Sequence, residues 1–294
     1  RFGVKQRNKL LNKGLQPHLL TMTATPIPRT LALTLHGDLD VSQLDELPPG
    51  RTPINTQLIS PKDKQYAYDL IRSEIMQGRQ IYVVLPLIEE SEKLELSSAV
   101  DVHHKLSTEV FSEFTVELLH GKMKSQEKQE VIHNFLNKKS DILVSTTVIE
   151  VGVDVPNASV MLIENSDRFG LAQLHQLRGR VGRGASKSYC LLSHQNKNKL
   201  SRQRLEVLVN SNDGFEISEI DLRFRGPGQV LGTKQSGLPD FALASLADDA
   251  DVLELARKEA RNILDLDPQL TNNLNLRILI KEQWNKLKIG NKLN

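Results

Sequence analysis

The chain has 294 residues, of which 38 are lysine or arginine and 36 are aspartate or glutamate, so its formal net charge is +2. This length predicts about two domains, and 39% hydrophobic with 25% charged residues is ordinary globular usage, which excludes disorder throughout. The longest apolar run, 81–88, is far shorter than the roughly 20 residues of a membrane-spanning helix. The chain has a single cysteine, Cys190, so an internal disulfide is excluded. No basic-then-apolar signal peptide opens the sequence, and both features favour a protein of the reducing cytoplasm.

The basic residues are unevenly distributed. Residues 1–30 hold six of them and no acidic residue, and residues 168–204 hold nine and again no acidic residue. Two local basic stretches in a nearly neutral protein indicate contact with the phosphates of nucleic acid or nucleotide. For either stretch alone, a solvated surface remains the alternative.

Taken in chain order, the predicted elements alternate. A strand at 19–25 precedes a proline-containing linker at 38–53. Five short apolar runs then read as buried strands, and three helical patterns lie among them, the second with Ser125 as its expected N-cap. The strands are 81–85, 116–119, 142–146, 160–163 and 189–192, and the helices are 64–77, 125–136 and 171–178. This alternation predicts an α/β fold with a doubly wound parallel sheet and helices on both faces.

The last third of the chain is expected to be helical. Two short helices, 198–210 and 215–224, are broken at 211–214, and a glycine-rich stretch follows at 225–237. Two amphipathic helices then cover 249–264 and 274–288.

The most specific motif is Gln176-Leu177-Arg178-Gly179-Arg180-Val181-Gly182-Arg183-Gly184. Two of its arginines, Arg180 and Arg183, lie three residues apart and place planar guanidinium groups on a tight, glycine-rich backbone. Such groups stabilise the charge of a phosphoryl group during transfer, which is the arginine-finger role in nucleotide hydrolysis. A basic turn that makes only surface contacts is the alternative.

A second motif spans residues 142–156, where a buried strand runs into Thr146 and Thr147 and then into Gly152-Val153-Asp154. Hydroxyls and backbone amides at a strand end suit contacts with a phosphate backbone. The carboxylate of Asp154 could accept a hydrogen bond from a ribose hydroxyl or orient an arginine, although a turn cap is its common role. Its position 26 residues before Arg180 makes the pair of motifs more specific.

Together these motifs resemble those of superfamily 2 helicases and translocases. Residues 145–156 resemble motif V, 176–183 resemble motif VI, and Thr23-Ala24-Thr25-Pro26 resembles motif III. Residues 23–29, 44–51 and 168–171 further resemble the RecG family of bacterial ATP-dependent DNA helicases. Residues 199–237 are similar to a translocation motif that this family shares with the transcription-repair coupling factor.

The resemblance implies a fold, an activity and a set of site residues. The expected fold is a RecA-like second helicase lobe with a C-terminal helical hairpin. The expected activity is ATP-dependent translocation on double-stranded DNA, which drives branch migration of Holliday junctions and regression of stalled forks in recombination and repair. The implied residues are Arg180 and Arg183 for catalysis; Gly152, Asp154 and Gln176 for the nucleotide; His120, Gly121, Thr146 and Thr147 for DNA; and Thr23, Thr25, Arg204, Arg225 and Gln235 for coupling.

The resemblance also divides the chain. It implies the end of a first RecA-like lobe at 1–37, a linker at 38–53, the second lobe at 54–195, the translocation hairpin and loop at 196–240, and a C-terminal helical region at 241–294. No Gly-x-x-x-x-Gly-Lys-[Ser/Thr] phosphate loop and no Asp-Glu-x-His occurs in the sequence. We therefore expect the C-terminal part of a motor, inactive alone, with no metal ligands of its own.

The cofactors of the intact enzyme would be ATP and Mg²⁺. Its expected partners are branched double-stranded DNA and single-stranded DNA-binding protein, with no membrane, for a monomer at the bacterial nucleoid. Two alternatives stay open: the motor of the transcription-repair coupling factor, against which the segment Asp45–Arg51 speaks, and a DNA-binding module without catalysis.

Overall fold

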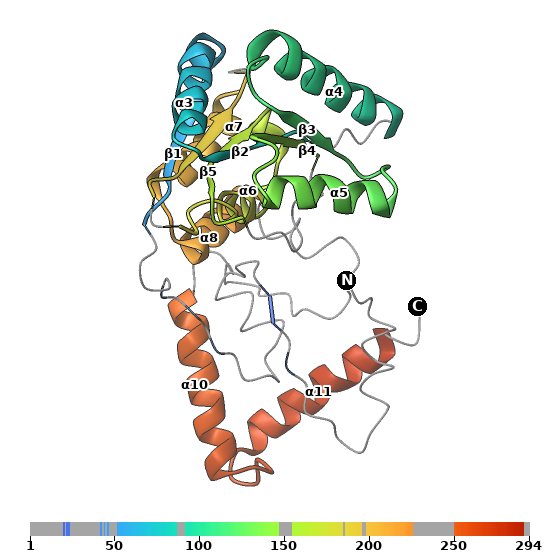
Figure 1. Ribbon diagram of the computed structural model, residues 1–294. Coiled ribbons are helices and arrows are strands. Elements are labelled where there is room, and N and C mark those ends of the chain that lie inside the picture. The colour runs from blue at the N-terminus through green and yellow to red at the C-terminus, as the bar shows by residue number, and fades with distance from the viewer. Residues whose placement is uncertain are drawn as a thin grey trace.

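A computed structural model of the chain describes residues 52–86, 92–146, 155–184, 186–195, 198–225 and 250–290, with the single residues 20, 22, 23, 42, 44 and 46. Its centre is one six-stranded sheet between two layers of helices (Figure 1). The strands are β1 (Asn55–Ile59), β2 (Gln80–Val84), β3 (Val116–Leu119), β4 (Ile142–Ser145), β5 (Ala158–Ile163) and β6 (Tyr189–Ser193).

The strand order is β1-β6-β5-β2-β4-β3, and every neighbouring pair is parallel. All residues of the central strands β2, β4 and β5 are buried. Strands covered on both faces read as continuous apolar runs, which is why these three are visible in the sequence.

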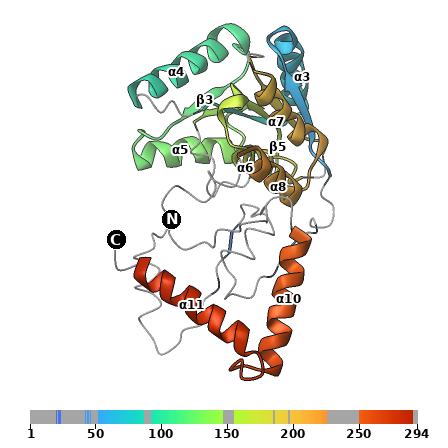
Figure 2. The same cartoon turned by 180° about the vertical axis from the view of Figure 1, so that it is seen from behind.

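Successive side chains of a strand point to opposite faces of the sheet, and each face has its own helices. Ile81 and Val83 pack with α3 (Lys64–Met76), with α4 (Glu92–Lys105) and with the π-helical turn Leu106–Val110. Tyr82 and Val84 belong to the cluster on the other face. That cluster includes side chains of α5 (Ser125–Leu136), α6 (Leu171–Arg178), α7 (Lys199–Asn210) and α8 (Gly214–Arg225). Figure 2 shows the same layers from behind.

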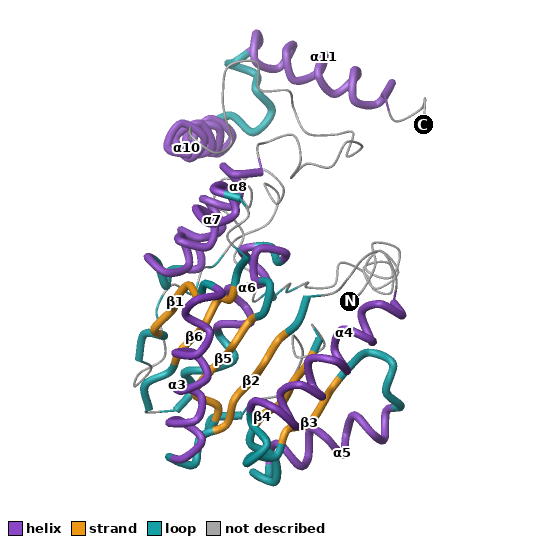
Figure 3. The backbone as a smooth tube through the Cα atoms, turned by 90° about the horizontal axis from the view of Figure 1, so that it is seen from above, coloured by secondary structure: helices purple, strands orange, loops and turns teal. Residues whose placement is uncertain are grey.

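Two further helices, α10 (Ala250–Leu266) and α11 (Leu274–Gly290), lie apart from the two layers (Figure 3). Asp267 organises the turn between them, because its carboxylate accepts hydrogen bonds from the backbone N–H groups of Thr271 and Asn272, both at 2.8 Å. Two short 3₁₀ helices, Pro61–Asp63 and Ser166–Arg168, complete the described elements. No helix in the described ranges is long and apolar enough to cross a membrane.

The predicted parallel α/β fold with helices on both faces is confirmed. The strand at 116–119 and the helices at 125–136 and 171–178 agree residue for residue with the structure, whereas β1 and α4 were not predicted. The expectation that Ser125 is an N-cap is wrong. Ser125 is the first residue inside α5, and the N-cap is Lys124, whose N–H donates to Glu127 Oε2 at 2.9 Å.

Three other expectations lie largely outside the described residues. These are the strand at 19–25, the linker at 38–53 and the glycine-rich stretch at 225–237. Leu20, Met22 and Thr23 are described, and none of the three lies in a strand. The domain boundaries remain predictions.

Candidate functional site

The two candidate arginines follow directly on α6. Three leucines of α6, at 171, 174 and 177, are fully buried and fix this helix on the sheet. The helix ends at Arg178, and the chain turns with the Arg180 N–H donating to Leu177 O at 3.0 Å. Arg180 and Arg183 are both partly exposed, and Arg183 Nε donates to Gly179 O at 3.3 Å. The arginine loop, residues 179–184, is therefore held by the end of a firmly packed helix.

Two glycines set the position of the arginine loop. Gly182 has a φ of +74°, and a Cβ there would lie 2.9 Å from Ile54 Cγ1. A Cβ at Gly184 would lie 2.9 Å from the carbonyl oxygen of Pro156. Only glycine allows the left-handed backbone at position 182 and the close approach to Pro156 at position 184. The loop thus lies between the start of β1 and the turn that contains Pro156.

At the carboxyl end of the sheet, two candidate DNA-binding residues lie side by side. Leu119 of β3 pairs with Ser145 of β4, and each strand is followed by a candidate, His120 and Thr146. The N–H of Thr146 donates to Leu119 O at 3.3 Å. Thr146 is only 1% exposed, and among the described residues its hydroxyl has no hydrogen-bond partner. His120 is half-buried.

The turn after β3 is exposed and carries positive charge. Gly121, Lys122 and Lys124 are exposed, and α5 begins immediately after them. Lys128 Nζ, from the first turn of α5, donates to Gly121 O at 2.5 Å and so fixes the turn. Cationic side chains next to a helix N-terminus suit an anionic ligand such as a phosphate backbone.

A third arginine of the same motif, Arg178, is buried, unlike Arg180 and Arg183. Arg178 is 2% exposed, and its Nη1 donates to the carbonyl oxygens of Leu208 at 2.7 Å and Ser211 at 2.8 Å. Both carbonyls lie at the C-terminal end of α7. The Nη1 also lies 3.4 Å from Thr56 Oγ1 on β1. Arg178 therefore connects the end of α6 with the end of α7.

His175 lies one turn before Arg178 and completes this network. Its Nδ1 is 3.0 Å from Arg178 Nη2, and because a guanidinium can only donate, Nδ1 is the acceptor. Burial, assisted by the charge of Arg178, lowers the pKa of His175 to about 4, so the ring is neutral at neutral pH. Burial also lowers the pKa of Arg178, but a guanidinium keeps its charge.

Arg204 ties α7 to the segment that precedes α6. Its Nη2 donates to the carbonyl oxygen of Phe169 at 3.2 Å. The two arginines thus cross between the helices in opposite directions, Arg178 from α6 to α7 and Arg204 from α7 towards the start of α6. Leu205 and Leu208 of α7 and Ile217 of α8 share the buried cluster with the leucines of α6.

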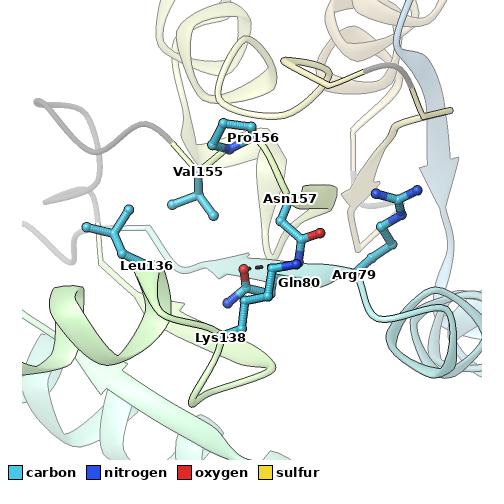
Figure 4. A pocket seen from close by; sticks show the side chains of 7 residues that line it. All are labelled: Arg79, Gln80, Leu136, Lys138, Val155, Pro156 and Asn157. Carbon is cyan, nitrogen blue, oxygen red and sulfur yellow. Dashed lines mark hydrogen bonds between the residues drawn. The ribbon is translucent and has the colours of Figure 1, made fainter.

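A hollow of about 390 Å³ lies at the opposite, amino-terminal edge of the sheet (Figure 4). Its residues are Arg79, Gln80, Leu136, Lys138, Val155, Pro156 and Asn157. The amide of Gln80 donates to Phe135 O at 2.6 Å and Ser140 O at 2.9 Å, and it accepts from Asn157 Nδ2 at 3.2 Å. The polar amide of Gln80 in the hollow therefore joins β2 to the end of α5 and to the start of β5 through its hydrogen bonds.

Comparisons with known proteins connect this geometry to a family. A family model described as "Helicase conserved C-terminal domain" matches residues 63–185, and one described as "ATP-dependent DNA helicase RecG, domain 3, C-terminal" matches residues 211–293. The ATP-dependent DNA helicase RecG of Synechocystis sp. is 60% identical over 290 residues, which are 99% of this chain. The chain belongs to the RecG helicase family.

Other RecG proteins give the same result. RecG of Bacillus subtilis is 50% identical over 267 residues, or 91% of this chain. A solved structure of RecG bound to a three-way DNA junction is 47% identical, with a TM-score of 0.65 over 83% of this chain and 31% of that one. The chain spans 35% of the Synechocystis protein and 39% of the Bacillus protein, a little over a third of the curated relatives.

The structure describes about half of the residues that the sequence assigned to a RecG-type site. Gln176, Arg180 and Arg183 lie on α6 and the arginine loop, His120, Gly121 and Thr146 lie at the carboxyl ends of β3 and β4, and Arg204 lies on α7. Thr23 is described but lies in no element. Gly152, Asp154, Thr147, Thr25 and Gln235 lie outside the described residues, and Arg225 ends α8 with its side chain outside them.

The described residues do not fit a Mg²⁺ site. In the described ranges, no group of three or more His, Cys, Asp or Glu side chains comes together to hold a metal ion. Carboxylate oxygens are the ligands that Mg²⁺ takes from proteins. No chemical step can therefore be assigned to a metal held by this part of the chain.

Two functional candidates were missed from the sequence. Lys128 fixes the exposed turn at Gly121, and Arg178 binds α7. Lys128 lies at the fourth position of α5, where its side chain reaches back over the preceding turn. Arg178 follows Leu171 and Leu174 at helical spacing, which places all three on the buried face of α6.

Proposed function

We propose that this chain is the C-terminal part of the motor of an ATP-dependent double-stranded DNA translocase and helicase. The intact enzyme would drive branch migration of Holliday junctions and regression of stalled replication forks, in DNA recombination and repair at the bacterial nucleoid. The observation that carries the proposal is the arginine loop: two partly exposed arginines, Arg180 and Arg183, held on a buried helix in a chain of the RecG family.

Arg180 and Arg183 are the proposed catalytic residues. Their guanidinium groups would stabilise the negative charge that develops on the transferring phosphoryl group of ATP, which a phosphate loop outside these 294 residues would bind. Gln176, Gly152 and Asp154 would contact the same nucleotide. The close packing of Gly182 and Gly184 limits how far the loop can move by itself, which keeps the arginines preorganised for that charge.

The proposed DNA-binding surface is the carboxyl end of β3 and β4. His120 and Gly121 would contact the phosphate backbone, assisted by the cations at the start of α5. Thr146, with Thr147, is proposed to contribute hydroxyls; in the structure the Thr146 side chain is buried, with its hydroxyl unpartnered among the described residues. A buried hydroxyl without a hydrogen-bond partner would gain one by bonding to a bound ligand.

Coupling of nucleotide state to DNA movement is proposed for Thr23, Thr25, Arg204, Arg225 and Gln235. Of these, Arg204 has a described contact, at Phe169 O, between α7 and the segment before α6. The substrates would be branched duplexes, in keeping with the RecG structure on a three-way DNA junction. Single-stranded DNA-binding protein is a further proposed partner, and a monomer the proposed state.

The test replaces Arg183 by alanine in the full-length enzyme. Junction-stimulated ATP hydrolysis should fall by about 10³-fold or more, because the arginine acts on charge present in the transition state. Junction binding in a mobility-shift assay should stay close to that of the wild type. Arg72→Ala, on α3 at the other face of the sheet from α6, is the matched control and should hydrolyse ATP normally.

Two results would contradict the proposal. Retention of more than about a tenth of wild-type turnover in Arg183→Ala would exclude an arginine-finger role. A wild-type enzyme that hydrolyses ATP on junctions without moving their branch point would exclude the translocase activity.

A further inference from the structure

Helix α7 has no cationic residue of its own at its C-terminal end, where a positive charge stabilises a helix. The last four carbonyls of a helix have no intrahelical partner, and the C-terminal end carries partial negative charge. No basic residue lies in the last turn of α7. The positive charge comes instead from Arg178, thirty residues earlier in the chain, which donates to Leu208 O in that turn and to Ser211 O just beyond it.

The two hydrogen bonds from Arg178 to Leu208 O and Ser211 O are strong. Both involve a charged donor, both are shorter than 3 Å, and the guanidinium is almost fully shielded from water. Charge-assisted hydrogen bonds of this length are about twice as strong as neutral ones. His175 accepts a third N–H and so fixes the rotation of the guanidinium plane.

Arg178 is also rigidly joined to the arginine loop. Val181 N–H donates to Arg178 O at 3.3 Å, so the residue lies within the turn that leads to Arg180 and Arg183. A displacement of that loop moves the Arg178 backbone directly. The side chain then transmits the displacement to α7, because separating the two would leave the buried charge of Arg178 without its carbonyl acceptors.

On the far side, α7 is joined to α8 by a short, hydrogen-bonded turn. Ser211 Oγ donates to Glu216 Oε2 at 2.5 Å, and Phe215 N–H donates to Asp213 Oδ1 at 2.8 Å. Ser211 is thus held by Arg178 on one side and by α8 on the other. A continuous chain of contacts runs from the arginine loop through Arg178 to the hairpin of α7 and α8.

The sequence pattern separates Arg178 from its neighbours. In the superfamily pattern Gln-x-x-Gly-Arg-x-Gly-Arg, Arg178 occupies an unspecified position. Its partner α7 belongs to the hairpin and not to the nucleotide site. We infer that Arg178 is the positioning residue through which movement of the arginine loop reaches the translocation hairpin. This inference rests on the proposed function.

The experiment compares two activities of the full-length enzyme carrying Arg178→Lys. Lysine keeps the charge but loses the planar fork that reaches two carbonyls and a ring nitrogen together. Junction unwinding should fall about tenfold, within the range for residues on a coupling path, while the kcat and KM of junction-stimulated ATP hydrolysis stay close to wild type. Arg202→Gln is the matched control, since Arg202 lies exposed on α7, where its Nε pairs with Glu206 Oε1 at 3.0 Å. It should leave both activities unchanged.

The result that overturns the inference is an unchanged ratio of unwinding to hydrolysis, whether both activities persist or both fall together. Wild-type hydrolysis and unwinding test the proposed function separately from this ratio. If Arg178→Lys does not fold, hydrogen exchange of residues 207–216 in the wild-type enzyme decides. A change on adding junction and a non-hydrolysable ATP analogue supports the inference, and identical exchange overturns it.

Discussion

At the scale of single residues, three arginines of one short motif do different work because their surroundings differ. Arg180 and Arg183 remain partly exposed on a loop, where they are available to a ligand, whereas Arg178 is buried and donates to carbonyl oxygens at the end of α7. The residue types and spacing in the sequence identify the first two. They do not identify the partner of the third, which lies thirty residues further along the chain.

A pattern in the sequence does separate Arg178 from the other two. Leu171, Leu174 and Arg178 follow the three- and four-residue spacing of one helix face, which predicts that the arginine is on the buried side. A buried arginine requires acceptors, so the spacing also predicts a structural partner. It leaves open which element supplies that partner, because the packing of α7 on α6 is a tertiary contact.

The neutral His175 predicts how stability depends on pH. Its pKa is about 4 in the folded protein, below the ordinary 6.5, so the unfolded chain binds the proton first as the pH falls. The free energy of unfolding should therefore fall as the pH falls from about 6.5 towards about 4, and not further for this group. His175→Gln, which keeps an acceptor for Arg178, should remove this part of the pH dependence.

Urea unfolding of both chains at pH 7.5, 6 and 5 measures the difference. The stability of the wild type should fall more steeply over this range than that of His175→Gln. Parallel curves would show that His175 is protonated as easily in the folded as in the unfolded chain.

At the scale of elements, the sequence predicts five of the six strands, including β3 at one edge of the sheet, and misses β1 at the other edge. β1 has one neighbour, β6, and three of its five residues, Asn55, Thr56 and Gln57, are polar, so it has no long apolar run. The helix α4 was missed as well, and its polar composition offers little helical periodicity. The elements that carry the arginine loop and the exposed turn, α6 and α5, were predicted to the residue.

The arginine loop itself gives an element-scale prediction. Gly182→Ala should destabilise the chain more than Gly78→Ala, although the two glycines have nearly equal φ values of +74° and +77°. Both alanines would be strained by about 1–2 kcal/mol from the left-handed conformation. Only at Gly182 would the new Cβ meet Ile54, which adds about 1–3 kcal/mol for overpacking.

Thermal or urea unfolding of the two variants isolates this contact, because the backbone cost cancels between them. Equal destabilisation would show that the loop does not pack against Ile54. In the full-length enzyme, Gly182→Ala should also lower ATP turnover, since it displaces the loop that carries Arg183.

At the scale of the whole molecule, the strand order assembles the candidate surface. β4 lies between β2 and β3, which brings His120 and Thr146 together although 25 intervening residues, including α5, separate them in the chain. The motifs give the type and order of these residues, while the crossover connections that make them neighbours depend on how the helices pack. The same holds for the arginine loop, which lies beside Pro156 because Gly184 has no side chain.

The last prediction concerns whether the isolated chain holds a complete ATP site. The arginine loop supplies charge to a reacting phosphate but no group that grips ATP, and the 294 residues contain no phosphate loop. The isolated chain should therefore release phosphate from ATP and Mg²⁺ no faster than buffer, with or without a DNA junction. The same chain with Arg183→Ala distinguishes a contaminant from a real site: a contaminating hydrolase gives equal rates in both preparations. Hydrolysis above the blank that disappears in Arg183→Ala would show that this chain holds a complete ATP site and would refute its assignment to one half of a motor.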